Sequence, residues 1–155
     1  MKKLFILIAF LAAYAGSAFA QNSVSWRQDG KRFSINIYTG DFSITWSDNE
    51  GNTFTIYGQD YDFEVSASGG IQYYTCGGPR EGKVSKVGST SIDYYTCGGP
   101  REGKVSKVGS TSIDYYTCGG PREGKVSNVG STIIDYYTCG GPKEGKVSSI
   151  SGNVK

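Results

Sequence analysis

The sequence of 155 residues contains no histidine, and this absence excludes several kinds of active site. Ser-His-Asp and Cys-His catalysis and His-ligated metal sites all need an imidazole. The four cysteines lie 21 residues apart, whereas paired zinc ligands are typically about two to four residues apart. A catalytic thiol needs a unique base and orienting group, which four copies of one environment do not supply. We therefore expect no catalytic residue, no metal site and no cofactor, and a protein that is not an enzyme.

The only long apolar segment lies at the start of the chain. Residues 1–20 begin with Lys2 and Lys3, continue with an apolar run from Leu4 to Ala15, and end in Ala18-Phe19-Ala20. This pattern predicts a secretory signal peptide, because the run is too short to span a bilayer and small residues stand at the cleavage position. We expect an exported protein of the periplasm, cell surface or extracellular space, with no transmembrane span.

An excess of one charge is also absent. Residues 1–20 hold two lysines and no acid, so residues 21–155 carry 14 basic and 14 acidic side chains. Phosphate binding needs a strong basic excess, so nucleic acid is not an expected partner. Large apolar side chains are few and glycine is abundant, with 23 in the chain. This composition predicts a thin or elongated sheet rather than a thick two-layer core.

A repeat of 21 residues dominates the second half of the chain. Residues 71–155 hold four copies of a unit such as IDYYTCGGPREGKVSKVGSTS. In one copy, the β-branched and aromatic residues 92–96 favour a strand, 97–103 form a Gly- and Pro-rich loop, 105–108 form a second strand, and 109–111 form a turn. We predict one β-hairpin per repeat, and an all-β fold built as an antiparallel β-hairpin array, either a meander or a solenoid-like elongated sheet.

Strand alternation assigns the tyrosines of each repeat to two faces. The first tyrosine of each pair shares a face with the isoleucine and is expected to point inward: Tyr73, Tyr94, Tyr115 and Tyr136. The second is expected to point outward: Tyr74, Tyr95, Tyr116 and Tyr137. Val105 and Val108 are three residues apart, so either a bulge returns both to one face or both faces are partly covered.

Residues 21–70 show alternating apolar residues separated by turn signals, such as Asp29-Gly30 and Thr39-Gly40. The pattern predicts an antiparallel meander that caps the four hairpin repeats of residues 71–155, with both parts in one continuous sheet. Residues 21–70 carry a net charge of −4 and residues 71–155 carry +4. This division could favour head-to-tail association, or it could be a solvated mixed surface.

The unit GKVSKVGSTSIDYYTCGGPRE resembles a YD (Rhs-type) repeat. The resemblance covers residues 71–155 and lies in the Gly-basic-aliphatic opening, a second aliphatic residue three positions later, and the closing tyrosines. The unit departs from the family in Tyr94-Tyr95-Thr96, which replaces a Tyr-x-Tyr-Asp ending, and in its Cys-Gly-Gly-Pro loop. The resemblance implies the hairpin architecture. It does not imply the shell around a cargo domain that long YD arrays build.

Cysteine geometry depends on how the repeats pack. In a meander, equivalent residues lie two strands or about 9.6 Å apart, whereas a disulfide needs Cα atoms about 4.4–6.8 Å apart. A solenoid would stack the cysteines about 4.8 Å apart and allow bridges between neighbouring repeats. Structural disulfides, unpaired thiols and intermolecular bridges are therefore all open for Cys76, Cys97, Cys118 and Cys139.

The outward tyrosines are the candidate ligand-binding residues. An evenly spaced aromatic row could stack sugar rings while neighbouring carboxylates accept hydroxyl hydrogen bonds, although the row could instead serve cross-strand packing. The candidates are Tyr74, Tyr95, Tyr116 and Tyr137 with Asp93, Asp114 and Asp135. Basic residues beside the proline loops could contact an anionic polymer or protect the sheet edge.

Two functions follow from these patterns. The first is a secreted, non-catalytic repeat protein that binds a cell-surface polysaccharide or protein. The second is a structural or self-associating cell-envelope protein, with homo-association through sheet edges or cysteines.

Overall fold

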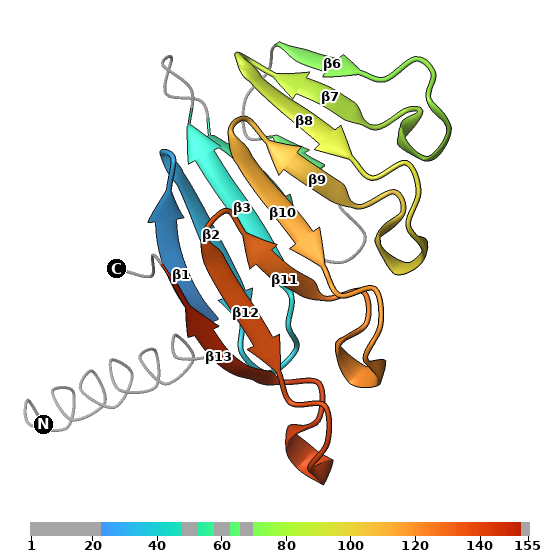
Figure 1. Cartoon of the computed structure of the whole chain (residues 1–155). Helices are drawn as coiled ribbons and strands as arrows, with labels where there is room; N and C mark the ends of the chain where they lie inside the picture. Colours follow the sequence, from blue (N-terminus) through green and yellow to red (C-terminus); the bar gives the residue numbers. More distant parts are fainter. Residues whose placement is uncertain (1–22, 48–52, 58–62, 66–69, 153–155) are drawn as a thin grey trace, which may run out of the picture.

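The computed structural model describes residues 23–47, 53–57, 63–65 and 70–152, so the expected signal peptide at 1–20 lies outside the described residues. These residues form two antiparallel sheets in which each strand pairs with its neighbours in sequence (Figure 1). The first sheet contains β1 (Ser23–Gln28), β2 (Lys31–Asn36), β3 (Phe42–Ser47), β4 (Thr53–Tyr57) and β5 (Phe63–Val65). The second contains β6 (Ile71–Tyr73), β7 (Val84–Val87), β8 (Thr90–Tyr94), β9 (Val105–Val108), β10 (Thr111–Tyr115), β11 (Val126–Val129), β12 (Thr132–Tyr136) and β13 (Val147–Ser151).

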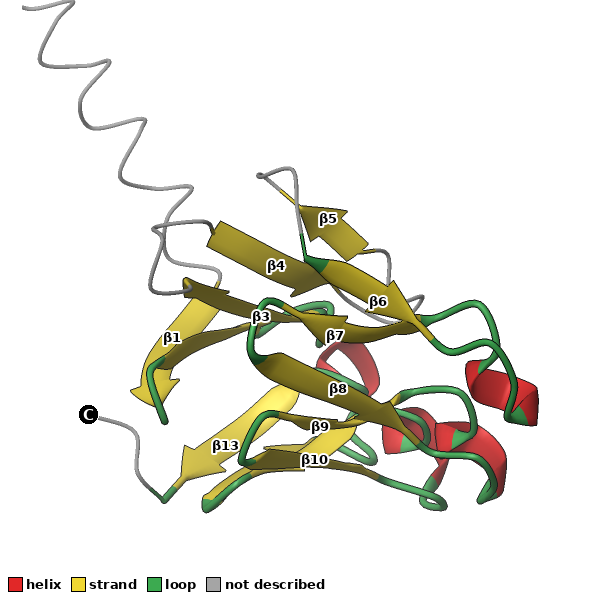
Figure 2. Cartoon of the chain, turned by 90° about the horizontal axis from the view of Figure 1, so that it is seen from above, coloured by secondary structure: helices red, strands yellow, loops and turns green. Residues whose placement is uncertain are grey.

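The predicted all-β hairpin array is confirmed, and it is a meander rather than a solenoid. The prediction of one continuous sheet is wrong, because the two sheets stack face to face (Figure 2). Each sheet has one apolar face, and stacking buries both faces in one core instead of leaving them in water. The expectation of a thin sheet without a two-layer core is wrong for the same reason.

The core is one cluster with contributions from both sheets. The first sheet supplies mainly aromatic and isoleucine side chains: Trp26, Phe33, Ile35, Phe42, Ile44, Trp46, Phe54 and Ile56. The array supplies smaller residues with three tyrosines: Val84, Val87, Ile92, Tyr94, Val105, Val108, Ile113, Tyr115, Val126, Val129, Ile134 and Tyr136. Bulky side chains on one layer thus offset the small ones on the other, so a glycine-rich sequence still fills a two-layer core.

A β-bulge in every repeat explains the two inward valines. Tyr94 pairs with Val105 and Asp93 pairs with Lys107, so Ser106 is the extra residue on β9. Val105 and Val108 are consequently both buried, at 1% and 0% exposure. The same shift of register recurs in the other three repeats. The bulge is the alternative that the structure supports.

The short turns between hairpins are two-residue loops. Gly109 has φ +61° and precedes Ser110, which places glycine where a type II′ turn requires a positive φ. Thr111, expected in the turn, instead starts β10 and pairs with Val108. Its hydroxyl donates to Asp29 Oδ2 at 3.0 Å, which fixes the first sheet against the middle of the array.

The strand β13, at one end of the array, is tied to the first sheet. The backbone N–H of Val147 donates to the carbonyl oxygen of Ile37 at 3.1 Å, and Lys146 Nζ lies 5.4 Å from the centre of the Tyr38 ring. At the other end, β6 contributes only three residues, and Tyr73 is 57% exposed. Among the described residues, the two ends of the array thus differ: β13 is bonded to the first sheet, whereas β6 is a short edge strand with an exposed tyrosine.

Candidate binding face on the repeat array

A tightly bonded loop follows the first strand of each hairpin. In the second repeat, the backbone N–H of Tyr95 donates to Lys104 O, and that of Gly103 donates to Tyr95 O, at 2.9 and 2.8 Å. Within this loop, η3 (Gly99–Arg101) is a single 3₁₀ turn. Gly98 precedes it with φ +115°, a conformation that glycine adopts readily. The loop has almost the same dihedral angles in all four repeats.

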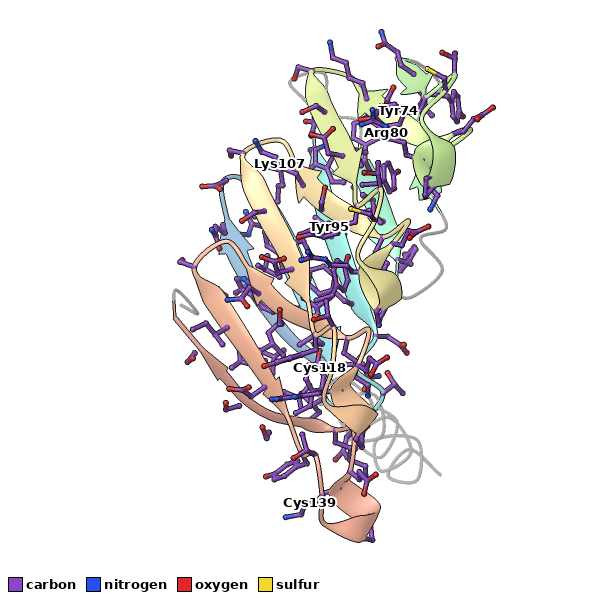
Figure 3. All side chains as sticks on the ribbon, turned by 45° about the vertical axis from the view of Figure 1, so that its right-hand side comes forward. Tyr74, Arg80, Tyr95, Lys107, Cys118 and Cys139 are labelled. Atoms are coloured by element: carbon purple, nitrogen blue, oxygen red, sulfur yellow. The ribbon has the colours of Figure 1, made fainter. Side chains whose placement is uncertain are left out.

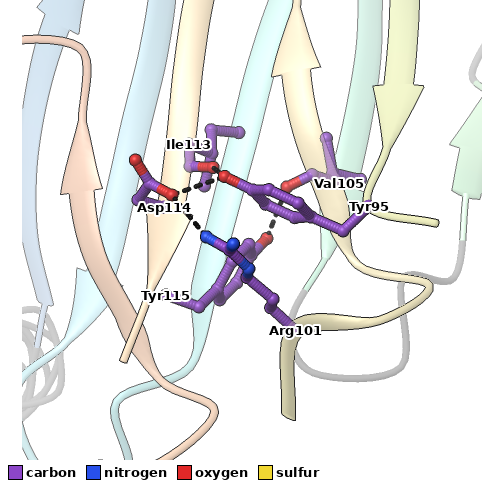
Figure 4. Close-up of polar contacts among 6 residues, drawn as sticks. All are labelled: Tyr95, Arg101, Val105, Ile113, Asp114 and Tyr115. Carbon is purple, nitrogen blue, oxygen red and sulfur yellow. Dashed lines mark hydrogen bonds and ion pairs between the residues drawn. The ribbon is translucent and has the colours of Figure 1, made fainter. Parts of the chain in front are cut away.

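This loop directs an arginine back over the second tyrosine of the repeat. The Arg101 guanidinium carbon lies 4.4 Å from the centre of the Tyr95 ring, and Nη1 lies 3.4 Å from Asp114 Oδ1 (Figure 4). The Tyr95 hydroxyl donates to the same Asp114 oxygen at 2.5 Å, with the Ile113 carbonyl oxygen at 3.1 Å as a second acceptor. Tyr95 and Arg101 belong to one repeat and Asp114 to the next, so the contact joins neighbouring repeats.

We define the Arg–Tyr–Asp unit as an arginine over a tyrosine ring whose hydroxyl bonds to an aspartate of the next repeat, and it occurs three times. In the second and third units the arginine also lies 3.4 and 4.0 Å from the aspartate. The arginine-to-ring distances are 4.6, 4.4 and 4.3 Å, and the tyrosine hydroxyl-to-carboxylate distances are 2.8, 2.5 and 2.6 Å. The three units are Arg80–Tyr74–Asp93, Arg101–Tyr95–Asp114 and Arg122–Tyr116–Asp135. Their repetition forms a row across the outer face of the array.

A second set of contacts lies beneath this row. Tyr95 meets the edge of Tyr115 with ring centres 6.1 Å apart, and the buried Tyr115 hydroxyl donates to Val105 O at 2.9 Å. Lys104 Nζ lies 5.2 Å from the Tyr115 ring centre and donates to the Gly124 carbonyl oxygen. The tyrosine ring pair and the lysine contact recur between each pair of neighbouring repeats, so the repeats are joined both at the surface and beneath it.

The row changes at its last member. Tyr137 carries Lys143 at 5.7 Å in place of an arginine. Tyr137 is 38% exposed, whereas Tyr74, Tyr95 and Tyr116 are half-buried. The predicted stripe of four outward tyrosines therefore consists of three tyrosines within Arg–Tyr–Asp units and Tyr137, which is paired with a lysine.

The aspartates of the units keep exposed oxygen atoms. The side chains of Asp114 and Asp135 are 51% and 47% exposed, although each already accepts a hydrogen bond from a tyrosine. Asp93 pairs across the strands with Lys107, which is exposed (Figure 3). This face can therefore donate and accept hydrogen bonds along its whole length.

The four cysteines are free and exposed in the structure. Each lies three residues beyond the end of a tyrosine strand, so the thiols stand along the edge of the array that carries the long loops, as Cys118 and Cys139 show (Figure 3). Neighbouring cysteines are two strands apart, which is wider than a disulfide allows without backbone movement. Among the described residues, no group of three or more potential His, Cys, Asp or Glu ligands could hold a metal ion.

No protein-family model, curated protein or solved structure matches this chain. The resemblance to YD repeats therefore stays a prediction. The described part of the chain contains no helix with the length and apolar character needed to cross a membrane.

Sequence reasoning placed the tyrosines and aspartates on one face but missed the role of the arginines. The basic residues beside the proline loops are predicted to contact an anionic polymer or to protect the sheet edge, whereas three of them, Arg80, Arg101 and Arg122, cover tyrosine rings. The only sequence signal is the constant spacing of six residues from tyrosine to arginine. The aspartate partner comes from the next repeat, which only the strand order reveals.

The units alter the acidity of their tyrosines. Burial raises the pKa of Tyr95 to about 12, and the hydrogen bond and negative charge of Asp114 act in the same direction, against a smaller lowering by Arg101. The pKa of Tyr116 is also raised to about 12, by burial first and Asp135 second. Burial raises the pKa of Tyr94 and Tyr136 as well.

These shifts predict a loss of stability at alkaline pH. A tyrosine whose pKa rises from 10 unfolded to about 12 folded stabilises the fold below pH 10, and this stabilisation disappears as pH rises to about 12. The free energy of unfolding should fall across this window, and less steeply in Tyr95→Phe. Denaturant titrations at successive pH values, with tyrosinate absorbance recorded in parallel, measure both quantities. A level stability between pH 10 and 12 would show that the tyrosines ionise as freely as in the unfolded chain.

Proposed function

We propose that the chain is a secreted, non-catalytic protein that binds a linear cell-surface polysaccharide along the outer face of its repeat array. One observation carries this proposal: the Arg–Tyr–Asp unit recurs three times with nearly unchanged geometry. A surface that repeats regularly is suited to a ligand that repeats regularly.

The spacing of the units supports a glycan chain. Successive units are two strands apart, which is about 9.6 Å. This distance is close to the length of one disaccharide in an extended polysaccharide. Each unit could then meet a chemically equivalent part of the ligand, and weak contacts at single units would add up through their linkage on one rigid sheet.

The chemistry of the units also suits sugar hydroxyl groups. The exposed carboxylate oxygens of Asp114 and Asp135 accept hydrogen bonds, and the guanidinium groups donate them. The tyrosine hydroxyls are already committed to aspartates, and the arginines cover the rings. The proposal therefore assigns direct contact to Asp and Arg, and gives the tyrosines the role of positioning residues.

The test is a pull-down of residues 21–155 on insoluble polysaccharides and cell-wall preparations, with a charge-matched pair of variants. The triple variant Asp93→Asn/Asp114→Asn/Asp135→Asn removes the charged hydrogen-bond acceptor from all three units. It should bind polysaccharide about tenfold more weakly, or weaker still. The control, Glu81→Gln/Glu102→Gln/Glu123→Gln, removes the same charge from exposed loop positions and should bind like the wild type.

Three results would count against the proposal in a protein that circular dichroism shows to be folded. These are failure of the wild type to bind any preparation, equal binding by the aspartate variant, and equal weakening in the glutamate control. Binding only to protein-containing preparations, lost on protease treatment, would replace the polysaccharide with a protein partner.

The second candidate is a structural, self-associating envelope protein. The observation that favours it is the row of four exposed thiols, whose spacing within one chain disfavours intramolecular bridges. Oligomers that disappear on reduction, from a protein that binds no polysaccharide, would favour this function.

A further inference from the structure

We infer that the first sheet carries a separate site for a single neutral sugar ring, on its outer face near the turn between β2 and β3. A hollow of about 330 Å³ lies there. It is lined by Tyr57 on β4, by Asn36 and Asp41 beside the turn, and by Ser34 and Ser43 on the neighbouring strands β2 and β3. This site lies outside the repeat array, so it does not depend on the function proposed for the array.

Cross-strand register explains why the hollow exists. Ser34 pairs with Ser43, and Ser43 pairs with Tyr57, so two small side chains stand beside one large ring on neighbouring strands. The largely buried side chain of Phe42, which is 7% exposed, adds an apolar surface to the lining of the hollow. A volume of about 330 Å³ is at the small end of the range for ligand pockets, roughly 300–1,000 Å³, which favours a ligand of one ring.

Asn36 and Asp41 are held in place by their own turn. Asn36 Oδ1 accepts hydrogen bonds from the backbone N–H groups of Tyr38 and Thr39, at 2.9 and 3.2 Å. The side-chain N–H₂ group of Asn36 remains as a donor. Asp41 Oδ2 accepts a hydrogen bond from Thr39 Oγ1 at 2.6 Å, which leaves its second oxygen as an acceptor. These groups are ordered before a ligand arrives, which lowers the entropic cost of binding.

The combination indicates the chemical class of the ligand. Tyr57 is 48% exposed and offers an aromatic ring to the apolar C–H face of a sugar. The amide of Asn36, the carboxylate of Asp41 and the serine hydroxyls offer donors and acceptors for its hydroxyl groups. The negative charge of Asp41 is partly balanced by Lys125, with which it interacts, so the hollow carries little net charge and the expected ligand is a neutral pyranose.

The test uses a panel of neutral monosaccharides, with ligand-observed saturation-transfer NMR on residues 21–155. Tyr57→Ala should weaken binding of the preferred sugar by about tenfold. Tyr38→Ala is the matched control, because Tyr38 is equally exposed at 53% and near the same turn but does not line the hollow. A second variant, Ser43→Leu, fills the hollow and should abolish binding while leaving Tyr57 in place.

Two results would overturn the inference: no sugar of the panel giving a saturable signal, or Tyr57→Ala and Ser43→Leu both binding as the wild type does. The triple aspartate variant of the array separates the two proposals. It should keep its affinity for the monosaccharide even where polysaccharide binding is lost.

Discussion

Replacing Tyr115 with alanine is expected to lower the free energy of unfolding by about 3–5 kcal/mol, the usual cost of deleting a buried aromatic side chain. Tyr115 is 5% exposed, and its hydroxyl donates to Val105 O at 2.9 Å. Its ring also meets the edge of Tyr95. The substitution would leave a cavity between the sheets and an unpaired carbonyl group. Denaturant unfolding followed by circular dichroism measures the change.

Tyr73 provides a control that the sequence alone would not suggest. It occupies the same repeat position as Tyr115, but it lies on the end strand β6 and is 57% exposed. Tyr73→Ala should therefore change the free energy of unfolding by no more than about 0.5 kcal/mol. Equal effects at the two positions would mean that β6 is covered as fully as the middle of the array.

The second large effect is expected for Gly98→Ala, at about 2–3 kcal/mol of lost stability. Gly98 has φ +115°, which strains any residue with a Cβ atom. A Cβ built there would lie 2.7 Å from Arg101 Nε, so the arginine must leave the Tyr95 ring. The variant thus loses the contact between Arg101 and the Tyr95 ring as well as the favourable loop conformation.

Gly140→Ala separates these two costs. Gly140 has the same conformation, with φ +119°, but Lys143 replaces the arginine and nothing lies within 4 Å of a built Cβ. This variant should show only the backbone strain, about 1–2 kcal/mol. The difference between the variants, about 1 kcal/mol, reports the arginine contact. Losses that are equal at Gly98 and Gly140 would show that the arginine over the ring contributes nothing to stability.

Much of the architecture could be predicted because it depends on local patterns. The 21-residue period, the hairpin in each repeat and the inward direction of Tyr94 and Tyr115 follow from alternation and from turn residues. The open choice at Val105 and Val108 was between two physical solutions, and the bulge at Ser106 is one of them. At these two valines, strand alternation reduces the possibilities to two but does not show which of them occurs.

The stacking of the two sheets could not be predicted in the same way. Alternation shows that each sheet has an apolar face, but it does not show which surface covers that face. The contacts that decide the matter join residues far apart in sequence, such as Asp29 with Thr111 and Ile37 with Val147. The low apolar content argued for a thin sheet, and this was misleading because Trp26, Phe33 and Phe54 supply the volume that glycine-rich repeats lack.

The sequence predicts which tyrosines and aspartates belong to the candidate site, but it does not predict which of them bond to each other. The tyrosines and aspartates share a face, as alternation requires, yet Tyr95 bonds to the aspartate 19 residues later rather than to one in its own repeat. This pairing depends on the strand order, because Tyr95 follows β8 and must reach across β9 to β10. The function of the face remains a proposal.

The most direct test of that proposal is an NMR titration of isotopically labelled residues 21–155 with a soluble fragment of the polysaccharide that they bind. Chemical-shift changes are expected to recur every 21 residues, at Asp93, Asp114 and Asp135 and at the arginine side chains beside them. Changes confined to the first sheet, or an unchanged array under conditions where the polysaccharide is bound, would contradict the proposal.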